Sequence, residues 1–309
     1  MTATDSVPTA GAETVAGAAV GGSQDTGAAP GYVPRRTLKL RVELIRQLKR
    51  RRTQWTFGLM FALPVVLLIA LQVGVDGGDG GGQTDSRISL VDVATASGLN
   101  FTLFVLFATT GFFLVVVFAL FFGDSIASEA QWGSLRYALA SPIPRARLLR
   151  QKYAAALVLS LAALALLVVT AVIAGGLFFG WGAAQTPIGL SLAPGDAYPR
   201  MLAIVGYLAL TQVTVGSFAF WLSCRTDAPL AAVGGAVFTI IVCGILDSID
   251  QLGFLRDYLP TNEQYAWTGM LQSPVDSAHM LQGAILAVAY SSLFTGLAFR
   301  HFLRKDVVS

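Results

Sequence analysis

The side chains best suited to chemistry gather in one polar segment, residues 123–153, between two strongly apolar stretches. It opens with two carboxylates, Asp124 and Glu129. It closes with a run of cations: Arg145, Arg147, Arg150 and Lys152. Carboxylates and guanidinium groups make charge-assisted hydrogen bonds, so this composition favours recognition of a charged partner. The segment therefore predicts a docking surface rather than a catalytic centre.

Other chemical motifs point the same way. The sequence contains no Gly-x-x-x-x-Gly-Lys-Ser/Thr loop, the motif that cradles nucleotide phosphates. His279 and His301 are far apart, and no cluster has the spacing of metal ligands. Cys224 and Cys243 lie in or beside apolar runs, which favours small buried side chains. We expect no metal site, no disulfide, no bound cofactor and no enzymatic activity in this chain.

The elements that must position this segment are membrane spans. The 309 residues are 54% hydrophobic and only 13% charged, whereas soluble domains carry about 25% charged residues. Charge-free windows of about 20 residues are long enough to cross a bilayer as helices. We expect an all-α integral membrane protein with six spans, at residues 55–73, 99–122, 154–179, 201–222, 229–246 and 280–299.

Three regions are expected along the chain. Residues 1–34 are rich in Ala, Gly, Thr and Ser, a composition typical of a disordered tail. Residues 35–305 are expected to form a six-span membrane domain, and residues 306–309 a short tail.

The membrane domain begins with a basic stretch, residues 35–52. Its apolar side chains recur at helical spacing: Leu38, Val42, Ile45 and Leu48. Its other positions are largely basic, and they include Arg35, Arg36, Lys39, Arg41, Arg46 and Lys49. This pattern predicts an amphipathic helix in the interface of the anionic cytoplasmic leaflet. Glu43 is the one acid on it, expected either to pair with Arg46 at the surface or to face a partner.

The positive-inside rule sets the expected orientation. With six spans and the N-terminus in the cytoplasm, 18 of the 21 lysine and arginine residues are cytoplasmic. The exceptions are Arg87, Arg200 and Arg256. Both termini and the 123–153 segment are therefore expected inside the cell.

The predicted spans carry no Asp, Glu, Lys or Arg at their centres. Proton-coupled carriers usually keep ionisable groups there, so the driving force is expected to enter elsewhere. Polar residues of the fourth span, Thr211, Gln212 and Thr214, either join helices or line a pathway. In the fifth span Gly234 and Gly235 offer a small-residue face for helix contact.

The 123–153 segment resembles the cytoplasmic loop of the ABC type-2 permease family, the membrane subunits of many bacterial exporters. The family pattern of an acid, Gly-Ser/Thr-Leu, an apolar stretch, Pro and a basic residue is read here at Glu129, Gly133, Ser134, Leu135, Leu139, Pro142 and Arg145. Arg136 departs from the acid that the family often has there. Tyr258, Leu259, Pro260 and Trp267 look like the family's short helical elements between spans five and six.

The resemblance implies a coupling helix over residues 129–139, stopped by Pro142 and Pro144, which docks on a separate ATPase subunit. The docking residues would be Glu129, Trp132, Gly133, Ser134, Leu135, Arg136, Leu139, Pro142 and Arg145. ATP and Mg²⁺ would bind that partner. A second permease copy, most simply in a homodimer, and the bacterial cell membrane are also implied.

Several alternatives stay open. The cargo is expected to be a drug, a lipid or another amphipathic compound, with export favoured over import. Arg145, Arg147 and Arg150 suit phospholipid headgroups as well as a partner. A membrane anchor or assembly factor without transport activity is the second hypothesis, and a proton-coupled carrier is the third.

Overall fold

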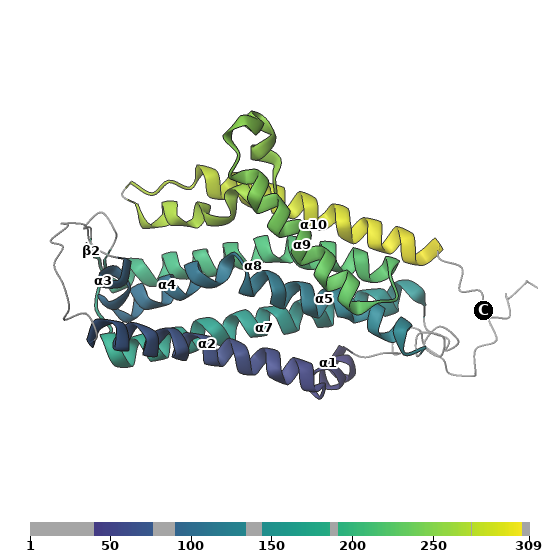
Figure 1. The fold of residues 1–309 in the computed structure, drawn as a ribbon, viewed down its shortest axis with the longest axis horizontal. Helices are drawn as coiled ribbons and strands as arrows, with labels where there is room; N and C mark the ends of the chain where they lie inside the picture. The colour runs from purple at the N-terminus through teal and green to yellow at the C-terminus, as the bar shows by residue number, and fades with distance from the viewer. Residues whose placement is uncertain (1–39, 77–89, 134–143, 186–190, 273, 305–309) are drawn as a thin grey trace, which may run out of the picture. The chain divides into compact units, whose positions relative to one another are not determined.

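The structure, a computed structural model, describes residues 40–76, 90–133, 144–185, 191–272 and 274–304, and these are almost entirely helical (Figure 1). The elements in chain order are α1 (Leu40–Leu48), α2 (Arg51–Asp76), α3 (Leu90–Thr95), α4 (Gly98–Thr110), α5 (Phe113–Gln131), α7 (Arg145–Phe179), β1 (Ala184–Gln185), β2 (Ser191–Leu192), α8 (Pro194–Arg225), α9 (Pro229–Asp247), η2 (Asp250–Tyr258), η3 (Asn262–Leu271) and α10 (Ala278–Arg304). The predicted tails, and the predicted loop residues that fall in the gaps, lie outside these ranges.

Within the described ranges, six helices are long and apolar enough to cross a membrane: α2, α5, α7, α8, α9 and α10. The all-helical class and the number of candidate spans are therefore confirmed. Six such helices are the composition of a multi-pass membrane protein.

The predicted boundaries of the second span are wrong. Instead of one helix over residues 99–122, the chain forms α4 and α5, separated at Gly111 and Phe112. Phe112 has φ −134° and ψ −59°, outside the helical region. The hydroxyls of Thr109 and Thr110 donate to carbonyls one turn back, a pattern that often bends helices. As a result, residues 123–131 belong to an apolar helix and not to a loop.

The predicted coupling helix over residues 129–139 does not begin as expected. Glu129 lies in the last turn of α5, which ends at Gln131. The backbone amides of Trp132 and Gly133 donate to carbonyls of that last turn, and Gly133 has φ +67°. Glycine reaches this left-handed conformation at little cost, so it ends the helix here. Residues 134–143 lie outside the described part of the chain.

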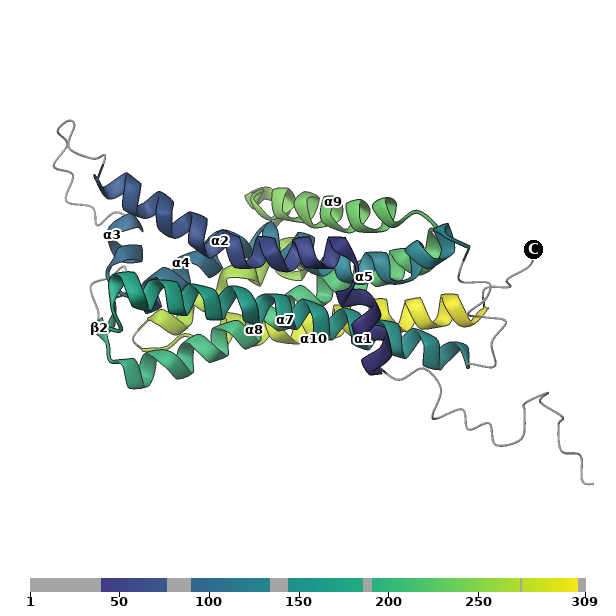
Figure 2. The same ribbon diagram turned by 90° about the horizontal axis from the view of Figure 1, so that it is seen from below.

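The interior forms where α5 lies among α7, α8 and α9 (Figures 1 and 2). Three rings interlock there: Phe122 of α5, Tyr153 of α7 and Phe220 of α8. The Tyr153 ring centroid lies 5.1 Å from that of Phe122 and 5.2 Å from that of Phe220, both in edge-to-face geometry. The Tyr153 hydroxyl also lies 2.9 Å from Ser217 Oγ. These contacts fix the relative positions of the three helices.

A glycine contact brings α4 against the far end of α7. A Cβ added at Gly98 would lie 2.7 Å from the Gly175 carbonyl carbon and 2.5 Å from the Gly176 nitrogen. Nearby, Asn100 accepts from the Gln185 backbone amide at 2.8 Å, and its side-chain amide donates to the Gln185 carbonyl at 2.6 Å. The short β1–β2 pair, with Ala184 opposite Leu192, is thereby attached to α4.

The remaining expectations differ in smaller ways. Within the described part of the predicted basic helix, residues 40–48 form α1, whereas Arg51 and Arg52 already belong to α2. The short helical elements expected between the last two spans are present as the 3-10 segments η2 and η3. The third span begins at Arg145, nine residues before the predicted start at 154.

Candidate functional site

The candidate site forms where α1 crosses the ends of α2, α5 and α7. The apolar face of α1 points outward, because Val42 is 58% exposed and Ile45 and Leu48 are also exposed. The inward face carries Glu43 and Gln47, both buried. A polar face can turn inward only if buried partners satisfy it, and Glu43 has such partners.

Lys152 of α7 connects Glu43 with α5. Its ammonium nitrogen lies 3.0 Å from Glu43 Oε1 and also pairs with Glu129. Each of the three side chains is at least 94% buried. Gln47 Nε2 donates to Glu43 Oε1 at 2.9 Å. One cation therefore connects carboxylates from two other helices.

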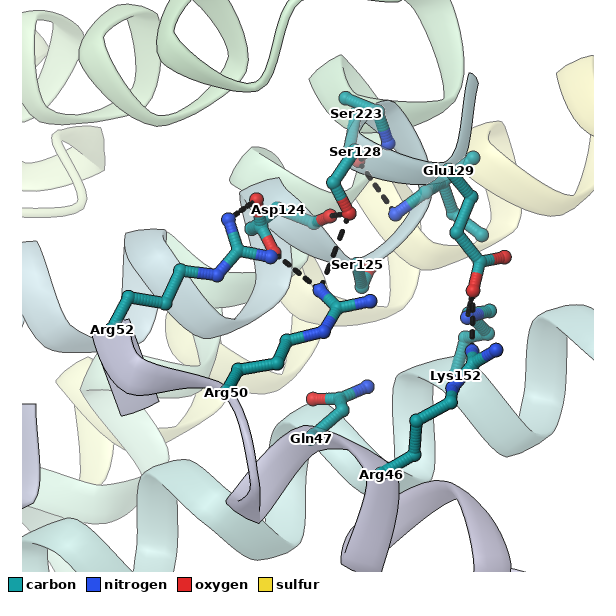
Figure 3. Close-up of polar contacts among 12 residues, drawn as sticks. Arg46, Gln47, Arg50, Arg52, Asp124, Ser125, Ser128, Glu129, Lys152 and Ser223 are labelled. Carbon is teal, nitrogen blue, oxygen red and sulfur yellow. Dashed lines mark hydrogen bonds and ion pairs between the residues drawn. The ribbon is translucent and has the colours of Figure 1, made fainter. Parts of the chain in front are cut away.

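Arg46 of α1 also pairs with the carboxylates of this group (Figure 3). It lies 2.8 Å from Glu43 Oε2 and pairs with Glu129. Glu129 therefore interacts with cations from both α1 and α7. Both cations also lie near the C-terminal end of α5, where the helix dipole favours positive charge.

A second ion group lies one turn earlier on α5 (Figure 3). Asp124 is buried and pairs with Arg50, whose Nη1 lies 3.1 Å from Oδ2, and with Arg52 of α2. Arg50 also donates to Ser128 Oγ at 3.4 Å, while Ser128 donates to the Asp124 carbonyl at 2.7 Å. We call the two groups together the arginine–carboxylate junction: Glu43, Arg46, Gln47, Arg50, Arg52, Asp124, Ser128, Glu129 and Lys152.

The end of α8 also contacts this region of α5. Ser223 Oγ accepts from the backbone amides of Ile126 and Ala127, at 3.1 and 2.9 Å. Ser223 is buried, so these bonds form away from solvent. The junction therefore lies where α1, α2, α5, α7 and α8 meet.

Electrostatics keep the junction charged. Burial alone would raise the pKa of Glu43, but Lys152, Gln47 and Arg46 outweigh it and lower the pKa to about 2. Burial alone would lower the pKa of Arg46, but Glu129 and Glu43 outweigh it and raise the pKa. Burial and the charge of Arg46 lower the pKa of Arg50, against the opposing effect of Glu129 and Glu43. Glu43 therefore stays ionised well into acid.

Ion pairs and hydrogen bonds hold the junction together. Its ion pairs join α1 to α5 and α7, the two helices that flank residues 134–143.

The structure places the predicted docking residues in different environments. Glu129 is buried in the junction, where it pairs with Lys152 and Arg46 of the same chain. Trp132 is 82% exposed, and Arg145 begins α7. Five of the predicted docking residues lie outside the described ranges: Ser134, Leu135, Arg136, Leu139 and Pro142.

The residues of the predicted basic helix, and its one acid, also lie in different environments. Arg41 and Lys49 are exposed, whereas Arg35, Arg36 and Lys39 lie outside the described part of the chain. Glu43 does pair with Arg46, as the sequence suggested, but the pair is not a surface pair because Glu43 is only 1% exposed.

Each of the candidate pathway and packing residues makes contacts of its own kind. Gln212 Nε2 donates to the Thr110 carbonyl at 3.1 Å, beside the α4–α5 break. Thr214 Oγ1 lies 3.1 Å from the Ala287 carbonyl, whereas Thr211 bonds within its own helix. Gly235 approaches Leu222, but Gly234 faces open space among the described residues. Gln212 and Thr214 therefore join helices.

Sequence reasoning missed the arginines of the second ion group and the α4–α5 break. Arg50 and Arg52 read as part of an interfacial basic run, and only their position opposite Asp124 reveals the pairing. The run Thr109-Thr110-Gly111 inside an apolar stretch was the available signal for the break.

A family model described as protein of unknown function (DUF2705) matches residues 86–308. The chain belongs to this family. The DUF2705 match includes α3 to α10, and therefore Asp124, Glu129 and Lys152 of the junction. The arginines and Glu43 of the junction precede it.

A relative is found in Bacillus subtilis (strain 168), the uncharacterized protein YhcI. It is 25% identical over 224 residues, which cover 68% of this chain and 67% of YhcI.

Proposed function

We propose that this DUF2705 chain is the membrane-spanning permease subunit of an ATP-driven ABC transporter. Its partner is a separate ATPase subunit that docks on the segment between α5 and α7. Its cargo is an amphipathic compound such as a drug or a lipid, and its direction is export. Both termini lie in the cytoplasm, and two permease copies form the transport unit in the bacterial cell membrane.

The observation that carries the proposal is the junction itself. Glu129 precedes the docking segment and Lys152 follows it, and the two side chains form an ion pair. Arg46 and Glu43 of α1 bind the same pair. A push on the segment from an ATPase is therefore delivered to α1, α5 and α7 together.

Further features support the same function. The apolar face of α1 is exposed, as an interfacial helix requires. The ends of α5 and α8 and the starts of α2 and α7 meet at one end of the bundle, so the basic sequences of the chain collect there (Figure 1). The loop residues that resemble the type-2 permease pattern follow directly on α5.

The test is reconstitution with the ABC ATPase encoded nearest to the gene for this chain. The full chain and that ATPase are co-expressed, purified and placed in proteoliposomes, and ATP hydrolysis and dye efflux are measured. We expect a stable complex, which Leu135→Asp in the docking segment disrupts and the exposed Lys49→Asp does not. Transport driven by a proton gradient without ATP would refute the proposal, and a complex without ATP-dependent transport would favour the anchor function.

A further inference from the structure

Four consecutive cations connect α1 to α2, and we call them the basic turn: Lys49, Arg50, Arg51 and Arg52. Arg50 and Arg52 both point toward the carboxylate of Asp124 (Figure 3). Among the described residues, Asp124 is the one acid with which any of the four forms an ion pair. Lys49 and Arg51 are exposed and form no ion pair within the described part of the chain. The basic turn therefore carries an excess of positive charge.

This excess extends to the surface of the protein. The side chains of Arg50 and Arg52 are 28% and 40% exposed, although both pair with Asp124 on their inner side. The pKa of the Arg50 guanidinium lies below its ordinary value, because burial and the nearby charge of Arg46 together outweigh the neighbouring carboxylates. An anion placed at this surface would therefore be attracted by the whole basic turn.

One face of α2 changes from basic to apolar directly after the basic turn. Arg51, Trp55 and Leu59 recur at every fourth position and are all exposed, Trp55 by 78% and Leu59 by 48%. Residues four apart lie on the same face of a helix. At a rise of about 1.5 Å per residue, Leu59 lies about 12 Å beyond Arg51 along the axis. Tryptophan is typical of the membrane interface. This face therefore matches a phospholipid, with its phosphate at Arg51 and its acyl chains at Leu59.

Exposed apolar side chains also border the basic turn on the side of α1. Ile45 is 42% exposed and Leu48 is 45% exposed, and Leu48 directly precedes Lys49. The excess charge thus lies between two exposed apolar surfaces, one on each helix. A soluble protein that paired with the cations would leave these surfaces in water, whereas the acyl chains around a lipid headgroup cover them. The surroundings of the turn therefore favour a lipid over an acidic protein.

We propose that the basic turn binds the phosphate of an anionic phospholipid, such as phosphatidylglycerol, whose acyl chains lie along Trp55 and Leu59. Lys49 and Arg51 supply charge-assisted hydrogen bonds to the phosphate oxygens. A headgroup with net negative charge is preferred over phosphatidylcholine, because choline would bring another cation to a turn that already has an excess. The proposal requires only that α2 lies in a bilayer, so its test does not depend on the proposed ATPase or on transport.

The test measures the fluorescence of Trp55 in the full chain, placed in nanodiscs of phosphatidylglycerol and phosphatidylcholine in equal amounts. The acyl chains of one lipid or of the other are brominated, because bromine quenches indole on contact. The contribution of Trp55 is the quenching that disappears in Trp55→Phe, a substitution at an exposed position that is expected to leave the fold intact. We expect bromine on phosphatidylglycerol to quench Trp55 about threefold more than bromine on phosphatidylcholine.

Two double variants separate the site from the net charge of the chain. Lys49→Gln with Arg51→Gln removes the two exposed cations of the basic turn, and we expect the preference for phosphatidylglycerol at Trp55 to fall by about half or more. Arg300→Gln with Arg304→Gln is the matched control, because it removes two exposed cations at the end of α10. We expect this control to keep the wild-type preference.

Salt provides a further check, because a rise from about 0.1 M to about 1 M shortens the screening length from about 10 Å to about 3 Å and should weaken the preference. Equal quenching by the two lipids in the wild-type chain at low salt would overturn the proposal. An equal loss of preference in both double variants would also overturn it, since net charge would then be the cause. Absence of a lipid preference, together with loss of an ATPase complex in the Lys49 and Arg51 variant, would instead identify a protein-binding surface.

Discussion

The ammonium nitrogen of Lys152 lies 3.0 Å from Glu43 Oε1, although 109 residues separate the two positions. Each side chain is 1% exposed, so water solvates neither charge. Taking two charges out of water is costly, and the pair is favourable only while both partners and their hydrogen bonds are present. The packing of α1 therefore depends on the ion pair that Glu43 makes with Lys152 of α7.

The first prediction is that Lys152→Met destabilises the chain by about 3–5 kcal/mol, because it leaves Glu43 and Glu129 buried without their shared cation. The measurement is the free energy of unfolding in mixed micelles. The control is Lys49→Met, an exposed position on the same side of the protein, which is expected to change stability by less than about 0.5 kcal/mol.

The same pair predicts a rescue. Lys152→Met combined with Glu43→Gln removes the unpaired carboxylate, and about half of the lost stability should return. Glu129 keeps its interaction with Arg46 in this double variant. Additive losses from the two substitutions would mean that Lys152 and Glu43 do not interact in the folded chain.

The second prediction concerns the stability of the chain at acid pH. The folded chain holds the pKa of Glu43 at about 2, below the ordinary value of 4.5. A lowered pKa gives stability that is fully present above about pH 4.5 and is lost as pH falls toward 2. The thermal midpoint of the wild-type chain should exceed that of Glu43→Gln at pH 6, and the difference should shrink steadily between pH 4.5 and 2. A difference that is constant over this range would contradict the assignment.

The sequence was sufficient for the periodic features of this fold. The spacing of Val42, Ile45 and Leu48 correctly indicated one apolar face on α1. Long apolar runs likewise gave the number of candidate spans and the positions of five of the six. These features depend on residues three or four positions apart, so they are visible in the local sequence.

The features that escaped prediction are those that depend on distant residues. Arg46 meets Glu129 across 83 positions, and Gln212 meets Thr110 across 102. The break at Gly111 lies in a mainly apolar run with only Thr109 and Thr110 beside it, so hydropathy alone extends the span across it. Because the predicted second span ended at residue 122, Asp124 and Glu129 were assigned to a loop and not to α5. The junction was missed for that reason.

The third prediction concerns the contact between α4 and α7. A methyl group at Gly98 would lie 2.5 Å from the Gly176 nitrogen, and backbone cannot yield as a flexible side chain does. Gly98→Ala should therefore separate the helices and destabilise the chain by about 1–3 kcal/mol. At Gly206 of α8 the same methyl group meets none of the described residues within 4 Å. Gly206→Ala should stabilise the chain by about 0.5–1 kcal/mol, because alanine is the better helix former.

In the same unfolding assay, we expect Gly98→Ala to lower the free energy of unfolding and Gly206→Ala to raise it. If Gly98→Ala were neutral, α4 and α7 would not lie in the contact that the structure shows. A destabilising Gly206→Ala would instead indicate a neighbour at that face of α8, such as a second copy of the chain.

The last prediction concerns the point at which α5 ends. Gly133 has φ +67°, and a Cβ added there meets none of the described residues within 4 Å, so backbone strain is the expected cost of a side chain. Gly133→Val should cost about 1–2 kcal/mol, whereas Gly133→Asn should be close to wild type, because Asn tolerates the left-handed region. Both substitutions add a side chain of similar size to the same site. If the end of α5 sets the direction of the docking segment, ATP hydrolysis by the partner should fall in complexes of the Val variant and persist with Asn. Equal loss with Val and Asn would mean that the side chain obstructs the partner and that the helix end has no such role.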